Sequence, residues 1–156
     1  ETFDLNILVE EVLNIVHSEI VIRNVSVVKD LKSEIPTLYG DTVQIQQVIL
    51  NLLINALDAL KDQALGSRHI LLSTRDAANN GVSFSITDSG PGLDPDQTKR
   101  IFNPFYTTKT HGMGLGLPIC RSITEAHGGN LWAENHDDGG ARFVFWLPIR
   151  KEDDHR

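Results

Sequence analysis

Polar side chains recur at helical spacing inside an otherwise apolar segment, Asp41 to Leu60. Steps of three and four residues place these side chains on one face of a helix. They are Gln44, Gln47, Asn51, Asn55 and Asp58. Because buried amides are costly unless they have partners, a row of them facing a concave surface indicates a bound polar ligand. We therefore predict that this helix lines a ligand site.

Asn55 is the candidate metal ligand in this row. Mg²⁺ prefers hard oxygen ligands in octahedral geometry, and it usually keeps several waters and takes phosphate oxygens. The side-chain amide of Asn55 supplies one neutral oxygen and leaves room for phosphates. Asn51 lies one turn away on the same face, where it is expected to contact phosphate or a metal-bound water. The alternative is that these amides only cap neighbouring backbone groups, but five polar residues in register favour a ligand.

Asp88 stands at the end of a predicted strand and is followed by Ser-Gly-Pro-Gly. An ionised carboxylate accepts hydrogen bonds and cannot donate them. It therefore suits the exocyclic amino group of adenine and disfavours guanine, which has a carbonyl there. Gly90 and Gly92 would let the backbone approach a base closely. The alternative is an ordinary turn, for which Asp-Ser-Gly-Pro is also typical.

A second glycine-rich segment runs directly into a predicted helix, so its backbone N–H groups and the helix dipole would form an anion site. The segment comprises Gly112, Met113, Gly114, Leu115, Gly116 and Leu117. It matches neither a Walker loop nor a Rossmann fingerprint, because the glycine spacing differs and Gly-Lys-Ser/Thr is missing. Lys109 is placed to reach the terminal phosphates, with Thr107 and Thr108 assisting. The alternative is that the segment is only a flexible hinge.

The elements that would position these residues alternate between helical and strand patterns. Asp4 and Asp41 are the expected N-caps of the first two long helices, and Gln44 would complete a capping box with Asp41. Helices are expected over residues 4–23, 41–60, about 96–102 and 114–127. Strands are expected over residues 25–31, 36–39, 68–76, 81–88, 130–135 and 141–147.

Length and composition describe a single globular domain. The chain has 156 residues, of which 40% are hydrophobic, and no apolar run approaches the ~20 residues that cross a bilayer. Its one cysteine, Cys120, excludes an internal disulfide and suits a reducing compartment. We therefore expect a cytoplasmic fragment without direct membrane contact. The net charge of −7 argues against binding to nucleic acid, although backbone amides and a bound metal would still admit a nucleotide.

Four segments of the chain resemble the sequence boxes of bacterial sensor histidine kinases. The asparagine box is similar to QQVILNLLINALDAL, the first glycine box to DSGPGL, the phenylalanine box to IFNPFYTTK and the second glycine box to GMGLGLPICRSITEAHGG. Their order and spacing match from about residue 41 to residue 148. The run PFYTTKTHGMGLGL, followed by EAHGGNLWAEN, is most similar to the oxygen-sensing and nitrogen-regulation kinases.

The resemblance implies the Bergerat ATP-binding fold shared with gyrase and Hsp90. This is an α/β two-layer sandwich of a mixed, mainly antiparallel sheet with three main helices. Residues 1–150 would form the catalytic and ATP-binding domain, with a lead-in helix and strands over 1–40 and an ATP lid over 102–113. Residues 151–156 would be a charged tail.

The resemblance also assigns roles to individual residues. It implies ATP and Mg²⁺ as cofactors, with Asn55 as the magnesium ligand and Asp88 as the residue that reads adenine. Gly112, Gly114 and Gly116 would contact the phosphates. Asn51, Asn55 and Lys109 are the residues expected to act in catalysis.

The activity implied by the resemblance is that of a protein histidine kinase in two-component signalling. The γ-phosphoryl group of Mg-ATP would pass to a histidine on a separate dimerisation domain of the same protein, and from there indirectly to a response regulator. The phosphoacceptor motif of the family has no match here, because His17-Ser-Glu-Ile is a poor candidate in the wrong place. The chain is therefore expected to be the catalytic domain alone.

Two other functions remain open from the sequence. One is an ATPase that acts as a nucleotide-driven conformational switch, as in the gyrase and Hsp90 relatives. Those relatives have a glutamate base one turn before the metal-binding asparagine, and here that position is Asn51, which cannot take a proton. This difference favours the kinase. The other is a nucleotide-sensing module without catalysis, which the presence of every expected ligand disfavours.

Overall fold

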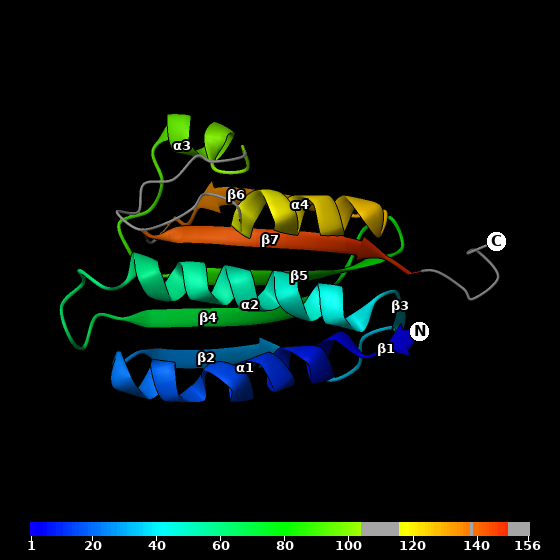
Figure 1. Cartoon of the computed structure of the whole chain (residues 1–156), viewed down its shortest axis with the longest axis horizontal. Helices are drawn as coiled ribbons and strands as arrows, with labels where there is room; N and C mark the ends of the chain where they lie inside the picture. The colour runs from blue at the N-terminus through cyan, green and yellow to red at the C-terminus, as the bar shows by residue number, and fades with distance from the viewer. Residues whose placement is uncertain (104–115, 138, 150–156) are drawn as a thin grey trace.

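Three long helices lie on one face of a five-stranded sheet (Figure 1). The computed structural model describes residues 1–103, 116–137 and 139–149. The long helices are α1 (Leu5–Ile22), α2 (Thr42–Ala59) and α4 (Gly116–Ala126), and a short helix, α3 (Pro95–Arg100), follows the central strand along the chain. Within the described ranges, no helix combines the length and the apolar character that a membrane span requires.

The sheet has the strand order β2-β4-β5-β7-β6. Only β2 and β4 run parallel, and the other three pairs are antiparallel. The strands are β2 (Ser26–Leu31), β4 (His69–Ala77), β5 (Gly81–Asp88), β6 (Asn130–Asn135) and β7 (Ala141–Pro148). The structure therefore confirms the predicted two-layer sandwich with a mixed, mainly antiparallel sheet.

The predicted helix starts are confirmed at both aspartates. Asp4 Oδ1 accepts the N–H of Asn6 at 2.8 Å, and Asp41 Oδ1 accepts the N–H of Gln44 at 3.1 Å. Each bond satisfies one of the donors that a helix leaves unpaired at its start. The capping box expected at Asp41 differs, because the N–H of Asp41 is donated to Nε2 of His127 at 3.1 Å.

A two-stranded sheet near the start of the chain was not predicted. The strands β1 (Thr2–Phe3) and β3 (Leu38–Tyr39) pair antiparallel, and the strand predicted over residues 36–39 is reduced to its last two residues. Two residues are too few to show the alternation that identifies a strand. The short sheet brings the first residues of the chain beside the start of α2.

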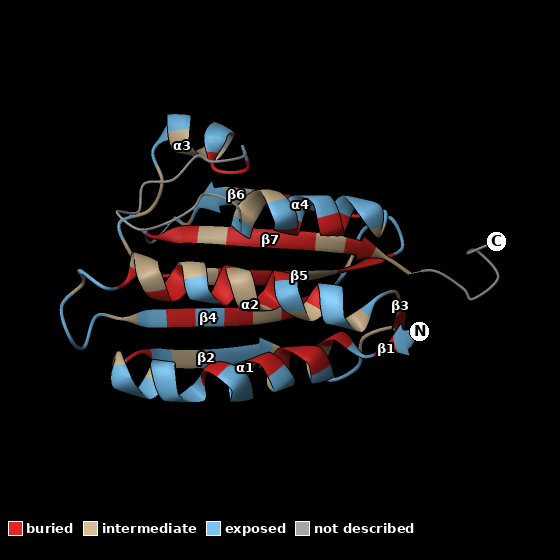
Figure 2. Ribbon diagram, viewed as in Figure 1, coloured by how far each residue is buried: buried red, intermediate tan, exposed pale blue. Residues whose placement is uncertain are grey.

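One hydrophobic core fills the space between the helices and the sheet (Figure 2). The inward residues Val82, Phe84 and Ile86 of β5 are at most 1% exposed, and the ring centroids of Phe84 and Phe145 lie 5.1 Å apart. From α1, the core takes Leu5, Leu8, Val9, Val12 and Val16. From α2, it takes Ile45, Val48, Ile49, Leu52, Leu53, Ala56 and Leu57. The apolar spacing seen in the sequence is therefore the packing surface of both helices.

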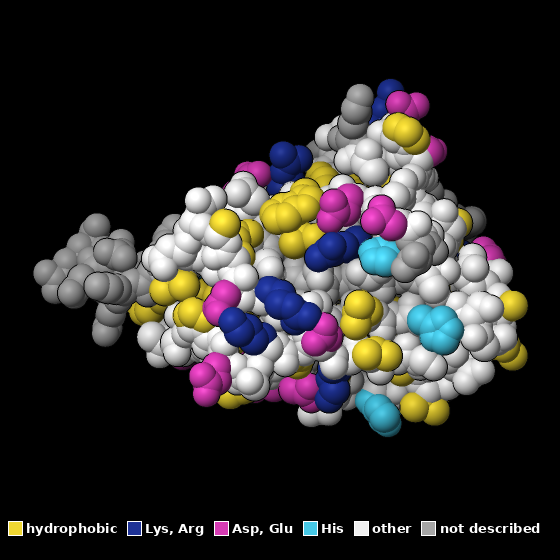
Figure 3. All heavy atoms as spheres, turned by 180° about the vertical axis from the view of Figure 1, so that it is seen from behind, with side chains coloured by type: hydrophobic (Ala, Val, Ile, Leu, Met, Phe, Trp, Pro, Cys, Tyr) yellow, Lys and Arg dark blue, Asp and Glu magenta, His cyan; other side chains and the backbone are white. Residues whose placement is uncertain are grey.

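No helix of the described residues covers the other face of the sheet, and Figure 3 views the molecule from that side. Hydrophobic side chains and charges of both signs are interspersed there. Arg75 pairs with Asp30, and Arg142 lies 3.8 Å from Glu134. Trp132 is 41% exposed on this face. A solvated face of this mixed kind is usual for an antiparallel sheet.

A closed ring of three hydrogen bonds ties α1 to the edge of the sheet. Thr74 Oγ1 donates to Asn6 Oδ1 at 2.8 Å and accepts the N–H of Lys32 at 3.0 Å, while Asn6 Nδ2 donates to Lys32 O at 2.7 Å. Thr74 is fully buried. The hydroxyl therefore satisfies two partners that would otherwise lose their hydrogen bonds inside the protein.

Thr74→Val should lower the free energy of unfolding by about 1–3 kcal/mol, because Val keeps the shape but leaves the Lys32 N–H and Asn6 Oδ1 unsatisfied. Urea denaturation followed by circular dichroism measures the change. Ser73→Ala, at the preceding and less buried position of β4, is the matched control. It should change the free energy of unfolding little. An unaltered urea midpoint for Thr74→Val would show that the ring does not hold α1 in place.

Candidate nucleotide-binding site

Asn51 lies beside the first described residues of α4. A Cβ built on Gly116 would lie 4.0 Å from Asn51 Nδ2. Gly116 is exposed and Asn51 is partly exposed. The predicted phosphate-facing amide is therefore close to the N-terminal end of a helix, where backbone N–H groups and the helix dipole favour anions.

Cys120 supports the Asn51 side chain from within the core. It is fully buried, and its thiol lies 3.9 Å from Val48 O. Burial raises the pKa of the Cys120 thiol to about 11, although a hydrogen bond with the Asn51 side chain acts in the opposite direction. The thiol is thus neutral at pH 7 and is no nucleophile.

Asp88 ends β5 with a buried carboxylate. The residue is 4% exposed, and its Oδ1 accepts the N–H of Gly90 at 2.9 Å and the N–H of Ala141 at 3.4 Å. Burial raises the pKa of Asp88, and these two hydrogen bonds partly oppose the shift. Neither bond uses Oδ2. The carboxylate therefore has one oxygen fixed by the backbone and a second with which to accept a hydrogen bond from a ligand.

The glycine after Asp88 is required by a close backbone approach. A Cβ on Gly90 would lie 2.9 Å from Ala59 O and 2.9 Å from Asp88 Oδ1. Ala59 is the last residue of α2. The loop after β5 therefore meets the C-terminal end of α2, and it brings Asp88 to the same helix that carries Asn51 and Asn55.

The polar residues predicted to share one face of α2 differ in their exposure to solvent. Gln44 and Gln47 are exposed, and Asn51 and Asn55 are partly buried. Asp58 Oδ1 accepts a hydrogen bond from Nη1 of Arg23 at 3.1 Å, so this carboxylate is engaged with the end of α1. A contribution of Asp58 to nucleotide binding stays a prediction.

Much of the second glycine segment and the predicted lid lies outside the described residues. This holds for Thr107, Thr108, Lys109, Gly112, Met113, Gly114 and Leu115. Phe102, the first residue of the predicted lid, is 8% exposed and packs edge-on against Phe143 with ring centroids 6.3 Å apart. The Arg121 guanidinium lies 5.6 Å from the centroid of the Phe102 ring. Phe102 therefore anchors this end of the segment to the core.

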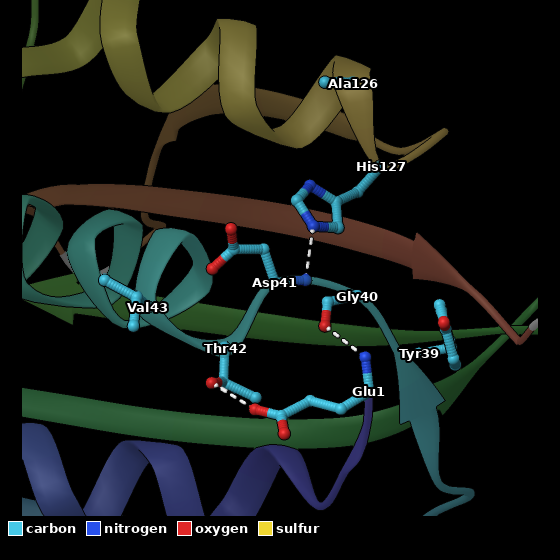
Figure 4. Close-up of a pocket in the computed structure, with 8 residues that line it drawn as sticks. All are labelled: Glu1, Tyr39, Gly40, Asp41, Thr42, Val43, Ala126 and His127. Atoms are coloured by element: carbon cyan, nitrogen blue, oxygen red, sulfur yellow. Dashed lines mark hydrogen bonds between the residues drawn. The ribbon is translucent and has the colours of Figure 1, made fainter.

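A hollow of about 620 Å³ lies at the other end of α2 and α4 (Figure 4). His127 donates from Nδ1 to Ile123 O at 2.8 Å and accepts the Asp41 N–H at Nε2, which ties the end of α4 to the start of α2. Gly40 makes room for the ring, because a Cβ there would lie 2.5 Å from His127 Cδ2. No spacing pattern in the sequence predicts this contact. The two helices are thus joined at one end, whereas Asn51 and Gly116 face each other nearer the other end.

Comparison with known proteins identifies the family. Residues 40–151 match the family described as histidine kinase-, DNA gyrase B- and HSP90-like ATPase. The chain is 44% identical over 113 residues to the sensor protein FixL of Bradyrhizobium diazoefficiens, covering 72% of this chain and 22% of FixL. It is 34% identical over 149 residues to the sensor histidine kinase ZraS of Escherichia coli K12, covering 96% of this chain and 31% of ZraS.

Solved structures agree with this assignment. The catalytic domain of histidine kinase ThkA has a TM-score of 0.85 and 36% sequence identity, with 95% of this chain and 94% of that chain covered. ThkA in complex with the response regulator TrrA gives a TM-score of 0.83 at 32% identity, with 100% of this chain and 43% of that chain covered. The chain belongs to the histidine kinase-, gyrase B- and HSP90-like ATPase family, and it has the fold of a histidine kinase catalytic domain. It spans less than a third of the length of FixL or ZraS.

Asp88→Asn should raise the free energy of unfolding at neutral pH. Burial raises the pKa of Asp88 in the folded chain above its value in the unfolded chain. Folding therefore favours the protonated carboxyl, and the ionised form lowers stability at every pH above the raised pKa. The amide Oδ1 can still accept from Gly90 and Ala141, so the variant loses the charge and keeps both bonds.

Urea midpoints measured from acid to neutral pH test this expectation. The gain of Asp88→Asn over the wild type should be largest near pH 7 and should fade as the pH falls through the raised pKa. Asp62→Asn, at an exposed position, is the control and should show no such trend. A variant that is less stable than the wild type at pH 7 would contradict the explanation.

Proposed function

We propose that this domain binds Mg-ATP and delivers the γ-phosphoryl group to a histidine on a separate dimerisation domain of the same protein. The observation that carries the proposal is the Asp88 carboxylate, buried at the end of the central strand with one oxygen fixed by two backbone N–H groups. An acceptor of this kind matches the exocyclic amino group of adenine. Guanine has a carbonyl at the same position. Its oxygen and the carboxylate are both acceptors, so no hydrogen bond could form between them.

The phosphate end of the nucleotide is proposed to lie between Asn51 and the start of α4. The Asn51 amide can donate to a phosphate oxygen, and the N–H groups at the start of α4 add positive potential. Lys109, Thr107, Thr108 and residues 112–117 are proposed to complete this end, and residues 102–113 are proposed to close over it.

The residues present fit a magnesium ion held mainly by the nucleotide. Asn55 offers one neutral amide oxygen, a ligand type that Mg²⁺ accepts. In the part of the chain that the structure describes, no three His, Cys, Asp or Glu side chains are grouped to hold a metal. Mg²⁺ usually binds through few protein ligands, with waters and phosphates filling the other positions. When bound, it would neutralise charge on the transferring phosphate.

Phosphoryl transfer fits the site better than ATP hydrolysis. Transfer needs mainly positioning and charge neutralisation, which the Asn51 amide and the α4 N-terminus can provide. Hydrolysis needs a group that takes a proton from water, and the amide of Asn51 cannot do so. The alternative is a nucleotide-driven conformational switch of the gyrase and Hsp90 kind.

The names of the relatives support the proposed partners. FixL and ZraS are named as sensor proteins, and ThkA was solved with its response regulator. We propose that a response regulator receives the phosphoryl group from the histidine of the dimerisation domain, and that this domain works in the cytoplasm. The net charge of −7 disfavours binding to nucleic acid.

Calorimetry with Mg-ATP and Mg-GTP on the 156-residue chain tests base recognition. ATP should bind more tightly, because at the position that faces Asp88 adenine has an amino donor and guanine has a carbonyl. Labelled ATP then separates the two activities: the chain alone should gain no stable label, and adding the dimerisation domain should give an acid-labile, base-stable phosphohistidine there. Release of labelled phosphate without transfer would favour the ATPase switch, and equal affinity for the two nucleotides would refute the role of Asp88.

Asn55→Ala should weaken Mg-ATP binding by at least about tenfold, as expected for loss of a charge-assisted ligand. Circular dichroism should remain native, because removing a partly exposed amide leaves no buried group unsatisfied. Binding measured with EDTA present should be unchanged, since the effect acts through the metal. Gln47→Ala, an exposed position on the same helix, is the matched control. Wild-type magnesium dependence in Asn55→Ala would show that the metal is held elsewhere.

A further inference from the structure

The loop that follows Asp88 is attached to the sheet at its first residue. Ser89 Oγ accepts the N–H of His69 at 2.8 Å and donates to Ser67 O at 2.6 Å. The backbone N–H of Ser89 donates to His69 O at 3.0 Å. Three hydrogen bonds therefore hold the start of the loop against the beginning of β4.

Asn135, the last residue of β6, holds the other end of the same loop. Its Oδ1 accepts the N–H of Leu93 at 2.7 Å, and its Nδ2 donates to Leu93 O. One side-chain amide thus pairs with both polar backbone groups of one residue, as a neighbouring strand would. The two residues are 42 positions apart in sequence, so this contact joins two separate parts of the fold.

The turn between β6 and β7 closes against the loop from the same side. A Cβ on Gly140 would lie 1.8 Å from Asp88 O, and a Cβ on Gly92 would lie 3.0 Å from Asn135 Oδ1. Both glycines have positive φ, +85° and +82°. The adjacent Ala141 donates its N–H to Asp88 Oδ1. The loop therefore rests directly on backbone here, with no space for side chains between them.

We propose that Asn135 is a positioning residue for base recognition. By fixing Leu93 it holds the segment 89–93 between two anchors, and the Gly90 N–H that orients the Asp88 carboxylate lies within that segment. Without the Asn135 amide, the segment loses both hydrogen bonds at Leu93. The Gly90 N–H is then placed less firmly, and the orientation of Asp88 Oδ1 depends more on the 3.4 Å bond from Ala141. The inference rests on the proposed function, because it assumes that Asp88 reads adenine.

The experiment compares Kd for Mg-ATP and Mg-GTP in the wild type and in Asn135→Ala. Loss of both amide bonds should weaken ATP about tenfold and GTP much less, so the ratio of the two affinities should fall toward one. This ratio does not depend on the fraction of folded protein, so partial unfolding cannot imitate the effect. Asn130→Ala, which changes an exposed asparagine at the other end of β6, is the matched control and should keep the wild-type ratio.

Asn135→Asp tests whether the hydrogen bonds of Asn135, rather than the volume of its side chain, hold Leu93 in place. Its carboxylate can still accept the Leu93 N–H but faces Leu93 O without a proton, so the ratio should fall as in Asn135→Ala. If the wild type binds ATP and GTP equally or not at all, the proposed function fails. If the wild type discriminates and either Asn135 variant keeps both the ATP affinity and the ratio, Asp88 retains its role and the positioning role of Asn135 is refuted.

Discussion

The burial of one carboxylate, that of Asp88, constrains the whole end of the sheet around it. A charged group that is removed from water needs hydrogen bonds from the protein. Here they come from Gly90, two residues later, and from Ala141, which is 53 residues away in sequence. Two backbone segments must therefore meet at one oxygen atom. The glycines at positions 90 and 140 follow from this requirement, because a Cβ at either position would collide with backbone.

The helix layer places two of the proposed site residues through the pairing of α2 with α4. α4 begins beside Asn51 and ends where His127 accepts the N–H of Asp41, so the two helices run in opposite directions. The His127 contact fixes their separation at one end. Nearer the other end, Asn51 Nδ2 would lie 4.0 Å from a Cβ on Gly116 at the start of α4. The same packing that buries the apolar side of α2 thus leaves Asn51 and Asn55 partly exposed.

Local patterns in the sequence predicted most of the fold. The amphipathic period and the aspartate caps located α1 and α2, and residues 81–88 were placed correctly as β5 because the strand is bounded by turn residues on both sides. Asn51 and Asn55 were singled out because amides interrupt an apolar helix, and Asp88 because it ends a strand just before a glycine-rich turn. The predicted magnesium and phosphate roles stay predictions, and many of the phosphate residues lie outside the described ranges.

What the sequence could not show are contacts between distant segments. Helical spacing placed Asp58 with the nucleotide-facing amides, but a long side chain from the end of α1, that of Arg23, reaches it. His127 and Asn135 lie in segments that carry the family resemblance, but those segments did not indicate their partners Asp41 and Leu93, which are 86 and 42 residues away. Periodicity reports which face of an element is buried and is silent on which neighbour covers it.

The parallel pairing of β2 with β4 decides where this domain can be cut. The family match begins at residue 40, after α1 and β2. Without residues 1–39, β4 would lose its neighbour β2 and become an edge strand, and its N–H and C=O groups would be open to pairing with another chain. The segment that matches the family model is therefore shorter than the folding unit. A protein that began at residue 40 would contain the proposed nucleotide-binding residues, but we expect it to aggregate through the exposed edge of β4.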